Sequence, residues 1–393
     1  MAEKVLYKGA TIIDGTGAAP IKGDLLIEGK DILEVGAVKC DDAKVVDLSG
    51  KFIMPGLVNA HVHATFEGDS PNPFELMSKE TDAMTALRGT RNLKKLLRSG
   101  VTFFRDMGAR NFVDVDLRNA RNQGIIDGPE FIVAGKVVTM TGGHAWMIGR
   151  QADGVDEVRK ATREQLRGGA DFIKIMATGG VLTPGVQPGA PQLNYDEIAA
   201  AVEEANKAGK KTATHAQGSV GILNAVKAGI NSVEHGFYMT DEIIELMIKK
   251  GTYFVPTLYA VFAIVDGGLA AGMPAFIVEK AERVMEDHKN SFRMAYKAGV
   301  KIAMGPDSGT PFNRHNETAM EIKLMVDCCM STMDALVSST KGSADLLGVL
   351  GRYGTLEKGK ATDFLVLGAN PVENISALQT NLESVYKLGK LVD

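Results

Sequence analysis

Cysteine, tryptophan and long apolar runs are scarce in this 393-residue sequence, and neither sign of charge is in large excess. There are three cysteines, Cys40 and the adjacent pair Cys328 and Cys329, and one tryptophan. Adjacent cysteines do not bridge each other easily, and an odd count does not make a disulfide framework. The sequence therefore excludes a small disulfide-stabilised fold and favours free thiols in a reducing compartment.

No run of about 18 apolar residues occurs, which excludes a membrane-spanning helix. The N-terminal residues lack the apolar core of a signal peptide. The net charge is −4, with acidic and basic residues mixed along the chain, which argues against a surface for nucleic acid or anionic membrane. We therefore expect a cytoplasmic protein that binds neither nucleic acid nor membrane.

The composition itself is that of a globular protein, with 45% hydrophobic and 23% charged residues. Both ends of the chain contain short β-forming runs separated by glycine-containing turns. These runs cover residues 4–7, 24–27, 32–35, 363–367 and 384–388. Because chain ends commonly lie together in folded domains, we expect residues 1–55 and 352–393 to form one small β-sandwich.

Residues 56–351 show a different pattern, in which apolar strands alternate with amphipathic helices. The clearest helices span 155–167 and 195–207, the second with Asn194 as its N-cap. The predicted strands span 56–60, 101–105, 131–134, 172–176, 212–215, 232–235, 253–256 and 301–304. Eight such strands predict an α/β fold, a (β/α)₈ TIM barrel that carries the terminal β-sandwich as a smaller domain.

Six polar residues occur at or near the ends of these predicted strands. They are His61, His63, Lys174, His215, His235 and Asp307. In a barrel of this kind, the carboxyl ends of the strands converge on the catalytic face. We therefore expect all six side chains to point into one cavity, although they are widely separated in the sequence.

Each of the six has a simpler alternative interpretation. His61 and His63 are two residues apart, so both imidazoles leave one face of a strand and suit a divalent metal, but strand-end histidines also serve structural roles. Asp307 lies in a Gly/Pro/Ser segment where aspartate often forms turns. Lys174 is either salt-bridged or a buried neutral amine, and a neutral amine can take up carbon dioxide to give a carbamate that bridges two metals.

The pattern resembles the amidohydrolase superfamily over nearly the whole chain. The resemblance rests on the run from Pro55 to His63 (PGLVNAHVH), on Lys174, on the two later histidines and on the Gly-x-Asp at Asp307. The runs TGGH at 141–144 and ATGGV at 177–181 resemble the branch that contains Xaa-Pro dipeptidases, arginine and lysine carboxypeptidases and ochratoxin-type amidases. Imidazolonepropionase is a more distant relation.

This resemblance implies two divalent metal ions, zinc by preference, bridged by N6-carboxylysine at Lys174. His61, His63 and Asp307 would bind one metal, and His215 and His235 the other. A hydroxide that bridges the metals would attack the substrate carbonyl, with Asp307 acting first as base and then as acid. Deaminases of the superfamily usually carry a glutamate shortly after the strand-five histidine, where this chain has Gln217.

Two further residues are candidates for substrate contact. His144 follows a glycine pair and is expected to bind a carboxylate or carbonyl oxygen of the substrate, the alternative being a hydrogen bond to the backbone. Tyr238 is expected to donate to the oxyanion of the transition state, the alternative being core packing. We expect Arg105 to form an ion pair and His288 to lie on a solvated helix face. His315 and Trp146 stay undecided between the cavity and packing.

The function predicted from these residues is hydrolysis of an amide or peptide bond in a small substrate, either an Xaa-Pro type dipeptide or an N-acyl amino acid. One alternative is a cyclic-amide hydrolase of the imidazolonepropionase kind. Another is a scaffold protein without activity, against which the retention of all six ligand positions argues. Barrels of this size often associate, so we also expect a homo-oligomer.

Overall fold

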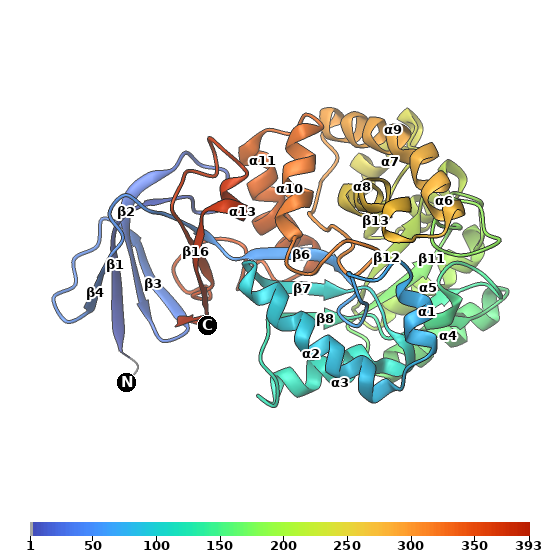
Figure 1. Ribbon diagram of the computed structural model, residues 1–393, viewed down its shortest axis with the longest axis horizontal. Coiled ribbons are helices and arrows are strands. Elements are labelled where there is room, and N and C mark those ends of the chain that lie inside the picture. Colours follow the sequence, from blue (N-terminus) through green and yellow to red (C-terminus); the bar gives the residue numbers. More distant parts are fainter. Residues whose placement is uncertain (1–2) are drawn as a thin grey trace.

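The computed structural model describes residues 3–393. One mixed sheet brings both chain ends together at the left of Figure 1. Its strands are β1 (Lys4–Ile12), β2 (Ile21–Glu28), β3 (Asp31–Gly36), β4 (Lys44–Asp47), β5 (Phe52–Pro55), β15 (Phe364–Leu367), β16 (Leu382–Lys387) and β17 (Lys390–Leu391). β15 pairs antiparallel with β5, with Phe364 opposite Pro55. The pairing of the two terminal segments that the sequence predicts is therefore present.

The terminal sheet branches along β1, because two different strands pair with successive parts of it. This branching allows a single sheet to enclose a hydrophobic core. β1 pairs with β4 at residues 5–8 and with β5 at residues 11–12. Tyr7 is buried and packs its ring edge-on against Phe364 and Tyr386, with ring centroids 5.0 and 5.2 Å away. Residues from both ends of the chain thus fill one hydrophobic core, and neither end could bury its apolar face alone.

The barrel begins directly after β5. Its strands are β6 (Leu57–Val62), β7 (Val101–Asp106), β8 (Glu130–Val133), β9 (Val137–Thr139), β11 (Phe172–Met176), β12 (Lys211–Ala216), β13 (Ser232–His235) and β14 (Tyr253–Val255), with the short β10 (Gly149–Gln151) beside β9. Neighbouring strands are parallel, and the central ones are buried throughout, as expected for a sheet covered on both faces. The predicted α/β barrel class is confirmed.

The predicted eighth strand, residues 301–304, is reduced to a single bridge between Phe254 and Ile302. The segment still closes the ring. Phe254 donates its backbone N–H to Lys301, Ala303 donates to Phe254, and Ala60 donates to Met304, at 2.8 to 3.0 Å. Residues 305–307 follow as Gly-Pro-Asp, and the left-handed backbone of Asp307 turns the chain away from the strand direction.

Helices cover the outside of the barrel (Figure 1). They are α1 (Pro73–Ser78), α2 (Asp82–Arg98), α3 (Val113–Asn122), α4 (Val155–Arg167), α5 (Tyr195–Lys207), α6 (Ser219–Ala228), α7 (Asp241–Lys250), α8 (Leu258–Gly267), α9 (Ala275–Ala298), α10 (Thr318–Asp327), α11 (Thr332–Val337) and α12 (Ser343–Leu347), with α13 (Ala377–Thr380) beside the terminal sheet. Helices α4 and α5 have the predicted bounds, and Asn194 and Glu197 form a capping box at the start of α5. Across residues 3–393, none of the helices combines the length and the apolarity needed to cross a membrane.

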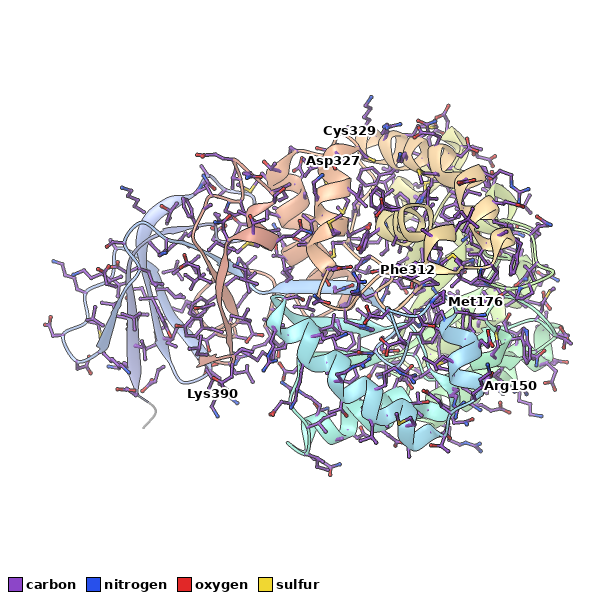
Figure 2. All side chains as sticks on the ribbon, viewed as in Figure 1. Arg150, Met176, Phe312, Asp327, Cys329 and Lys390 are labelled. Carbon is purple, nitrogen blue, oxygen red and sulfur yellow. The ribbon has the colours of Figure 1, made fainter. Side chains whose placement is uncertain are left out.

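The three cysteines are free thiols. Cys328 is buried and Cys329 is exposed at the end of α10, where Figure 2 labels it at the edge of the molecule. His288 corrects a prediction, because it is buried in α9 instead of lying on a solvated face. Its Nε2 atom lies 2.6 Å from the carbonyl oxygen of Pro256. The charged residues on both sides of His288 suggest solvent, but the helical repeat places His288 on the stripe that faces the barrel.

Candidate metal centre

All six predicted ligand residues line one cavity at the mouth of the barrel. The cavity has a volume of about 640 Å³ including its open end. His61 lies in β6, Lys174 in β11 and His215 in β12, while His235 ends β13. Asp307 follows the segment that closes the ring. All six residues are buried, so the structure brings together what the order of the residues predicts.

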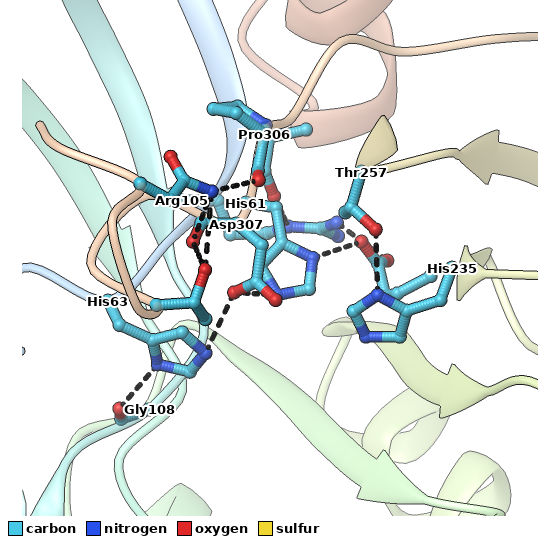
Figure 3. A network of polar contacts seen from close by, with 12 residues as sticks. His61, His63, Arg105, Gly108, His235, Thr257, Pro306 and Asp307 are labelled. Atoms are coloured by element: carbon cyan, nitrogen blue, oxygen red, sulfur yellow. Dashed lines mark hydrogen bonds and ion pairs between the residues drawn. The ribbon is translucent and has the colours of Figure 1, made fainter. Parts of the chain in front are cut away.

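Three of these side chains converge on one point. Oδ1 of Asp307 lies 3.2 Å from Nε2 of His61 and 3.5 Å from Nε2 of His63 (Figure 3). The three ligand atoms all lie within 4.8 Å of one another. Within the described part of the chain, this buried oxygen has no hydrogen-bond partner of acceptable geometry. Buried carboxylate oxygens are seldom left unpaired, so the arrangement fits a shared cation better than a set of mutual hydrogen bonds.

Hydrogen bonds behind the rings orient three of the histidines. Nδ1 of His61 lies 2.9 Å from Glu234, and Nδ1 of His63 lies 3.2 Å from the carbonyl oxygen of Gly108. Nδ1 of His235 lies 2.8 Å from Oγ1 of Thr257. A carboxylate and a carbonyl can only accept, so His61 and His63 carry the proton on Nδ1 and keep a lone pair on Nε2, which is how metal-binding histidines are usually fixed. The Thr257 hydroxyl engages Nδ1 of His235 and leaves Nε2 of that ring as the nitrogen available to the cavity.

His215 is held the other way round. Its Nε2 atom lies 3.3 Å from the carbonyl oxygen of Gly179, so this nitrogen carries the proton and Nδ1 is left as the acceptor. The ring centroid lies 4.4 Å from that of His235, which in turn lies 5.2 Å from that of His61. His215 and His235 therefore form a second pair of imidazoles beside the first cluster.

Burial keeps the imidazoles of His63, His215 and His235 neutral. It lowers the pKa of His63 to about 4 and holds the pKa values of His215 and His235 well below 6.5. Burial alone would raise the pKa of Asp307, but its interactions with His61, His63 and Lys174 hold it below its usual value. Neutral imidazoles and an ionised carboxylate are the forms that bind divalent metals.

Lys174 lies in the middle of this cluster. Its side chain is 2% exposed, and its ammonium nitrogen makes no hydrogen bond to any of residues 3–393. Burial lowers the pKa of Lys174 to about 8, so a substantial fraction of the amine is neutral near physiological pH. An unpartnered buried amine is costly, and this leaves Lys174 available for a further bond.

Glu234 is a residue that the sequence analysis missed. It is fully buried and contacts both His61 and Arg105, with a distance of 2.9 Å from its Oε1 to Nη2 of Arg105. Burial would raise the pKa of Glu234, but Arg105 and His61 outweigh it and lower the pKa to about 2. The ion pair expected for Arg105 is present. The identity of its partner was hidden because the two residues lie on different strands, β7 and β13.

The backbone is strained at three residues of the centre. His235, Thr257 and Asp307 have φ values of 73°, 54° and 67°, in the left-handed region that non-glycine residues seldom adopt. His235 ends β13, Thr257 follows β14 after Pro256, and Asp307 follows the segment 301–304 after Gly305 and Pro306, and all three line the cavity. Such strain persists only where the surrounding structure enforces it, and it is common at functional sites.

His144 lines the cavity, whereas Tyr238 does not. The ring of His144 packs on His215 with a centroid distance of 4.1 Å, and its Nδ1 lies 2.8 Å from Oγ1 of Thr183. Phe237 is among the described residues that line the cavity, and Tyr238 is not. The ring of Tyr238 packs against a neighbouring apolar cluster, and its role as a donor to the oxyanion stays a prediction.

The structure also locates His315 and Trp146, for which the sequence left open a place in the cavity or a role in packing. His315 is buried behind the centre, with Nε2 3.0 Å from the carbonyl oxygen of His63, so it supports the first cluster from outside. Trp146 is 46% exposed and is absent from the cavity wall that the described residues form. Neither is positioned as a ligand.

Comparison with known proteins agrees with the barrel fold. The sequence model of the amidohydrolase family matches residues 52–392, and the chain belongs to this family. It is 30% identical to the ochratoxinase of Aspergillus niger over 426 aligned positions, which cover 98% of this chain and 86% of the relative. The chain is thus a hydrolytic enzyme that acts on carbon–nitrogen bonds.

Solved structures show the same relationship. A Xaa-Pro dipeptidase with bound methionine superposes with a TM-score of 0.89 at 33% identity, and the match covers 99% of both chains. A prolidase in complex with N-methylphosphonate-L-proline superposes with a TM-score of 0.91 at 29% identity, again over 99% of both chains. These likenesses confirm the branch that the sequence motifs indicate.

Proposed function

We propose that this protein is a metal-dependent hydrolase that cleaves the amide or peptide bond of a small substrate, either a dipeptide or an N-acyl amino acid. The observation that carries the proposal is the convergence of four histidines, Asp307 and Lys174 in one cavity. An unpaired carboxylate oxygen and an unpaired amine lie among them in the described chain.

The donor set fits two divalent cations. His61, His63 and Asp307 would hold one, and His215 and His235 the other, through the ring nitrogens that the outer hydrogen bonds leave free. Nitrogen and oxygen donors of this kind suit zinc, although other first-row cations bind them too. When bound, such cations supply Lewis acidity, which lowers the pKa of water and polarises a carbonyl oxygen.

Lys174 would complete the centre as a carbamate. The lone pair on its neutral Nζ attacks dissolved carbon dioxide, the nitrogen loses a proton to solvent, and a carboxylate forms at the end of the side chain. The lowered pKa of the Lys174 amine makes the neutral form accessible. The change replaces a buried cation by an anion among the ligand residues, which removes the electrostatic cost of an ammonium beside two metal ions.

Asp307 is placed to move the proton that hydrolysis requires. Asp307 lines the cavity, and its pKa lies below the usual value for aspartate, so the side chain is a carboxylate near neutral pH. In the proposed reaction this carboxylate accepts a proton from the attacking water and then delivers it to the leaving nitrogen. The amine leaves as a neutral group, and the acyl part becomes a carboxylic acid that loses its remaining proton to solvent to give a carboxylate.

The walls of the cavity favour an apolar substrate. Beyond the ligand residues, they consist mainly of apolar side chains, among them Phe66, Phe74, Ile148, Met176, Leu182 and Phe237. His144, Gln217, Thr257 and Thr310 add uncharged polar groups. A dipeptide or N-acyl amino acid with apolar side chains matches this lining, and it matches the methionine and proline groups named for the two solved relatives.

Elemental analysis of purified wild type and Lys174→Ala tests the metal centre. We expect about two metal ions per wild-type chain and a sharp fall in the variant, with the exposed Lys207→Ala variant as the matched control. Amine release is then measured with a panel of dipeptides and N-acyl amino acids. One metal or none, unaffected by Lys174→Ala, would contradict the bridged centre. Ring opening without amine release would favour the cyclic-amide alternative.

A further inference from the structure

The segment of residues 178–192 between β11 and α5 holds His144 at three points. The side chain of Gln192 accepts a hydrogen bond from the backbone N–H of His144 at 3.0 Å. Gly180 lies under the imidazole, where an added Cβ would be 2.5 Å from Cε1 of the ring. Oγ1 of Thr183 lies 2.8 Å from Nδ1 of the same ring. His144 is therefore fixed in position and in ring orientation.

The hydroxyl group of Thr183 has one hydrogen, and its partners decide where that hydrogen goes. Its oxygen accepts a hydrogen bond from the backbone N–H of Ala145 at 3.3 Å. Among residues 3–393, the remaining partner of this hydroxyl is Nδ1 of His144. Because a backbone N–H can only donate, the Thr183 hydrogen is free to point at Nδ1. With the hydrogen on that contact, Nδ1 accepts and the proton of the neutral ring lies on Nε2, whereas the opposite tautomer would leave the Thr183 hydrogen without a partner among residues 3–393.

Thr183 is itself held from the opposite side. Nζ of Lys280, a buried residue of α9, donates to the carbonyl oxygens of Thr183 and Val186 at 3.2 and 2.6 Å. These bonds tie the segment to the helix layer of the barrel. The position of the Thr183 hydroxyl is thus set by the protein and does not depend on a bound substrate.

We propose that Thr183 is a positioning residue that fixes His144 as an Nε2–H donor toward the cavity, where His144 binds a carboxylate or carbonyl oxygen of the substrate. The inference rests on the proposed function for the identity of the substrate. For the tautomer of the His144 ring, the inference rests on the hydrogen-bond partners of Thr183 and not on the substrate. The opposite tautomer would present a lone pair to the substrate oxygen and would repel it.

Nitrogen NMR of zinc-loaded, ¹⁵N-histidine-labelled protein tests the tautomer without any substrate. The His144 signals are assigned by their loss in His144→Ala. We expect wild type and Thr183→Ser to carry the proton on Nε2, and Thr183→Val, which lacks the hydroxyl, to shift toward the other tautomer or a mixture. A proton on Nδ1 in wild type, or an unchanged tautomer in Thr183→Val, would overturn the inference.

Steady-state kinetics test the consequence for the substrate. For a hydrolysed dipeptide or N-acyl amino acid, Thr183→Val should raise KM about tenfold with a smaller effect on kcat, as loss of one oriented hydrogen bond predicts. Thr183→Ser should restore most of the wild-type KM. In the His144→Ala background, Thr183→Val should add no further loss, whereas an equal loss in both backgrounds would contradict the role.

The two tests separate the inference from the proposed function. If wild type hydrolyses no substrate of the panel, the proposed function fails, while the NMR comparison still decides the role of Thr183. If wild type is active and Thr183→Val changes neither tautomer nor KM, the inference fails and the proposed function stands.

Discussion

Asp307 combines a strained backbone, a buried side chain and an oxygen without a hydrogen-bond partner in residues 3–393. The cost of holding a carboxylate in this state is of the order of a few kcal/mol. The neighbouring imidazoles and Lys174 keep it ionised. A group kept in this condition next to the cavity is suited to accept a proton, which is the role proposed for it above.

The variant Asp307→Asn removes the proton acceptor with almost no change in shape. We expect kcat to fall by about 10²–10⁴-fold, the usual contribution of a general base, while the thermal unfolding midpoint stays near that of wild type. Metal content is measured alongside, since loss of metal would lower kcat for a different reason. A variant that keeps kcat within twofold of wild type would contradict the role of Asp307.

Single positions also show what one sequence can and cannot predict. The six candidate ligands follow from residue types at predicted strand ends, because a barrel brings those ends together. Glu234 and Thr183 were missed, because their importance lies in contacts with His61 and His144 on other elements. Phe237, two residues after His235, lines the cavity, whereas Tyr238 is not among the described residues that line it. The spacing of Tyr238 from His235 alone does not show which way its hydroxyl points.

The segment of residues 178–192 provides a prediction for a whole element. Gly180→Ala places a methyl group against the His144 ring, at 2.5 to 2.7 Å from its atoms. We expect the ring or the segment to move and kcat/KM to fall at least about tenfold, since small displacements of a binding group are costly. Circular dichroism should report an unchanged fold.

Gly351→Ala is the matched control for this change. A Cβ on Gly351 meets no atom within 4 Å, and its φ lies outside the left-handed region. We expect kinetics like those of wild type. Equal kinetic losses in the Gly180 and Gly351 variants would show that the effect does not arise from contact with His144.

The regular elements were easier to predict than the irregular ones. Helices α4 and α5 have predicted bounds because amphipathic repeats and the Asn194 cap are local signals. Residues 301–304 were predicted as a full strand from their apolar character. Their ladder is cut short by the Gly-Pro-Asp that follows and by the turn at Asp307. The early end of this strand is set by the site to which Asp307 belongs, and the apolar character of residues 301–304 does not reveal it.

An ionic cluster joins the barrel to the terminal sheet. Glu130 in β8 contacts Lys387 in β16 at 2.8 Å and Arg121 at 3.2 Å, and it accepts a hydrogen bond from Tyr353. Lys387 also contacts Asp363 at the base of β15. Burial would raise the pKa of Glu130, but Lys387 and its other partners lower it to about 2. The folded protein therefore favours the ionised form more strongly than the unfolded chain does.

This shift predicts how stability depends on pH. Because the pKa of Glu130 is lowered on folding from about 4.5, its contribution is fully present above about pH 4.5 and is lost as the pH falls toward 2. Glu130→Gln should reduce the free energy of unfolding by about 1 kcal/mol at pH 7, after allowance for solvent screening. The difference from wild type should shrink toward acidic pH. Urea unfolding at several pH values measures it, and a difference that grows on acidification would contradict the assignment.

The pairing of β15 with β5 also has a consequence for how the chain is made. β5 emerges from the ribosome early, yet its antiparallel partner follows roughly 300 residues later. At synthesis rates of about 5–20 residues per second, one edge of the first sheet stays open for about 15–60 s. An open edge can pair with another nascent chain, so the newborn protein is at greatest risk of aggregation just before its last strands are translated.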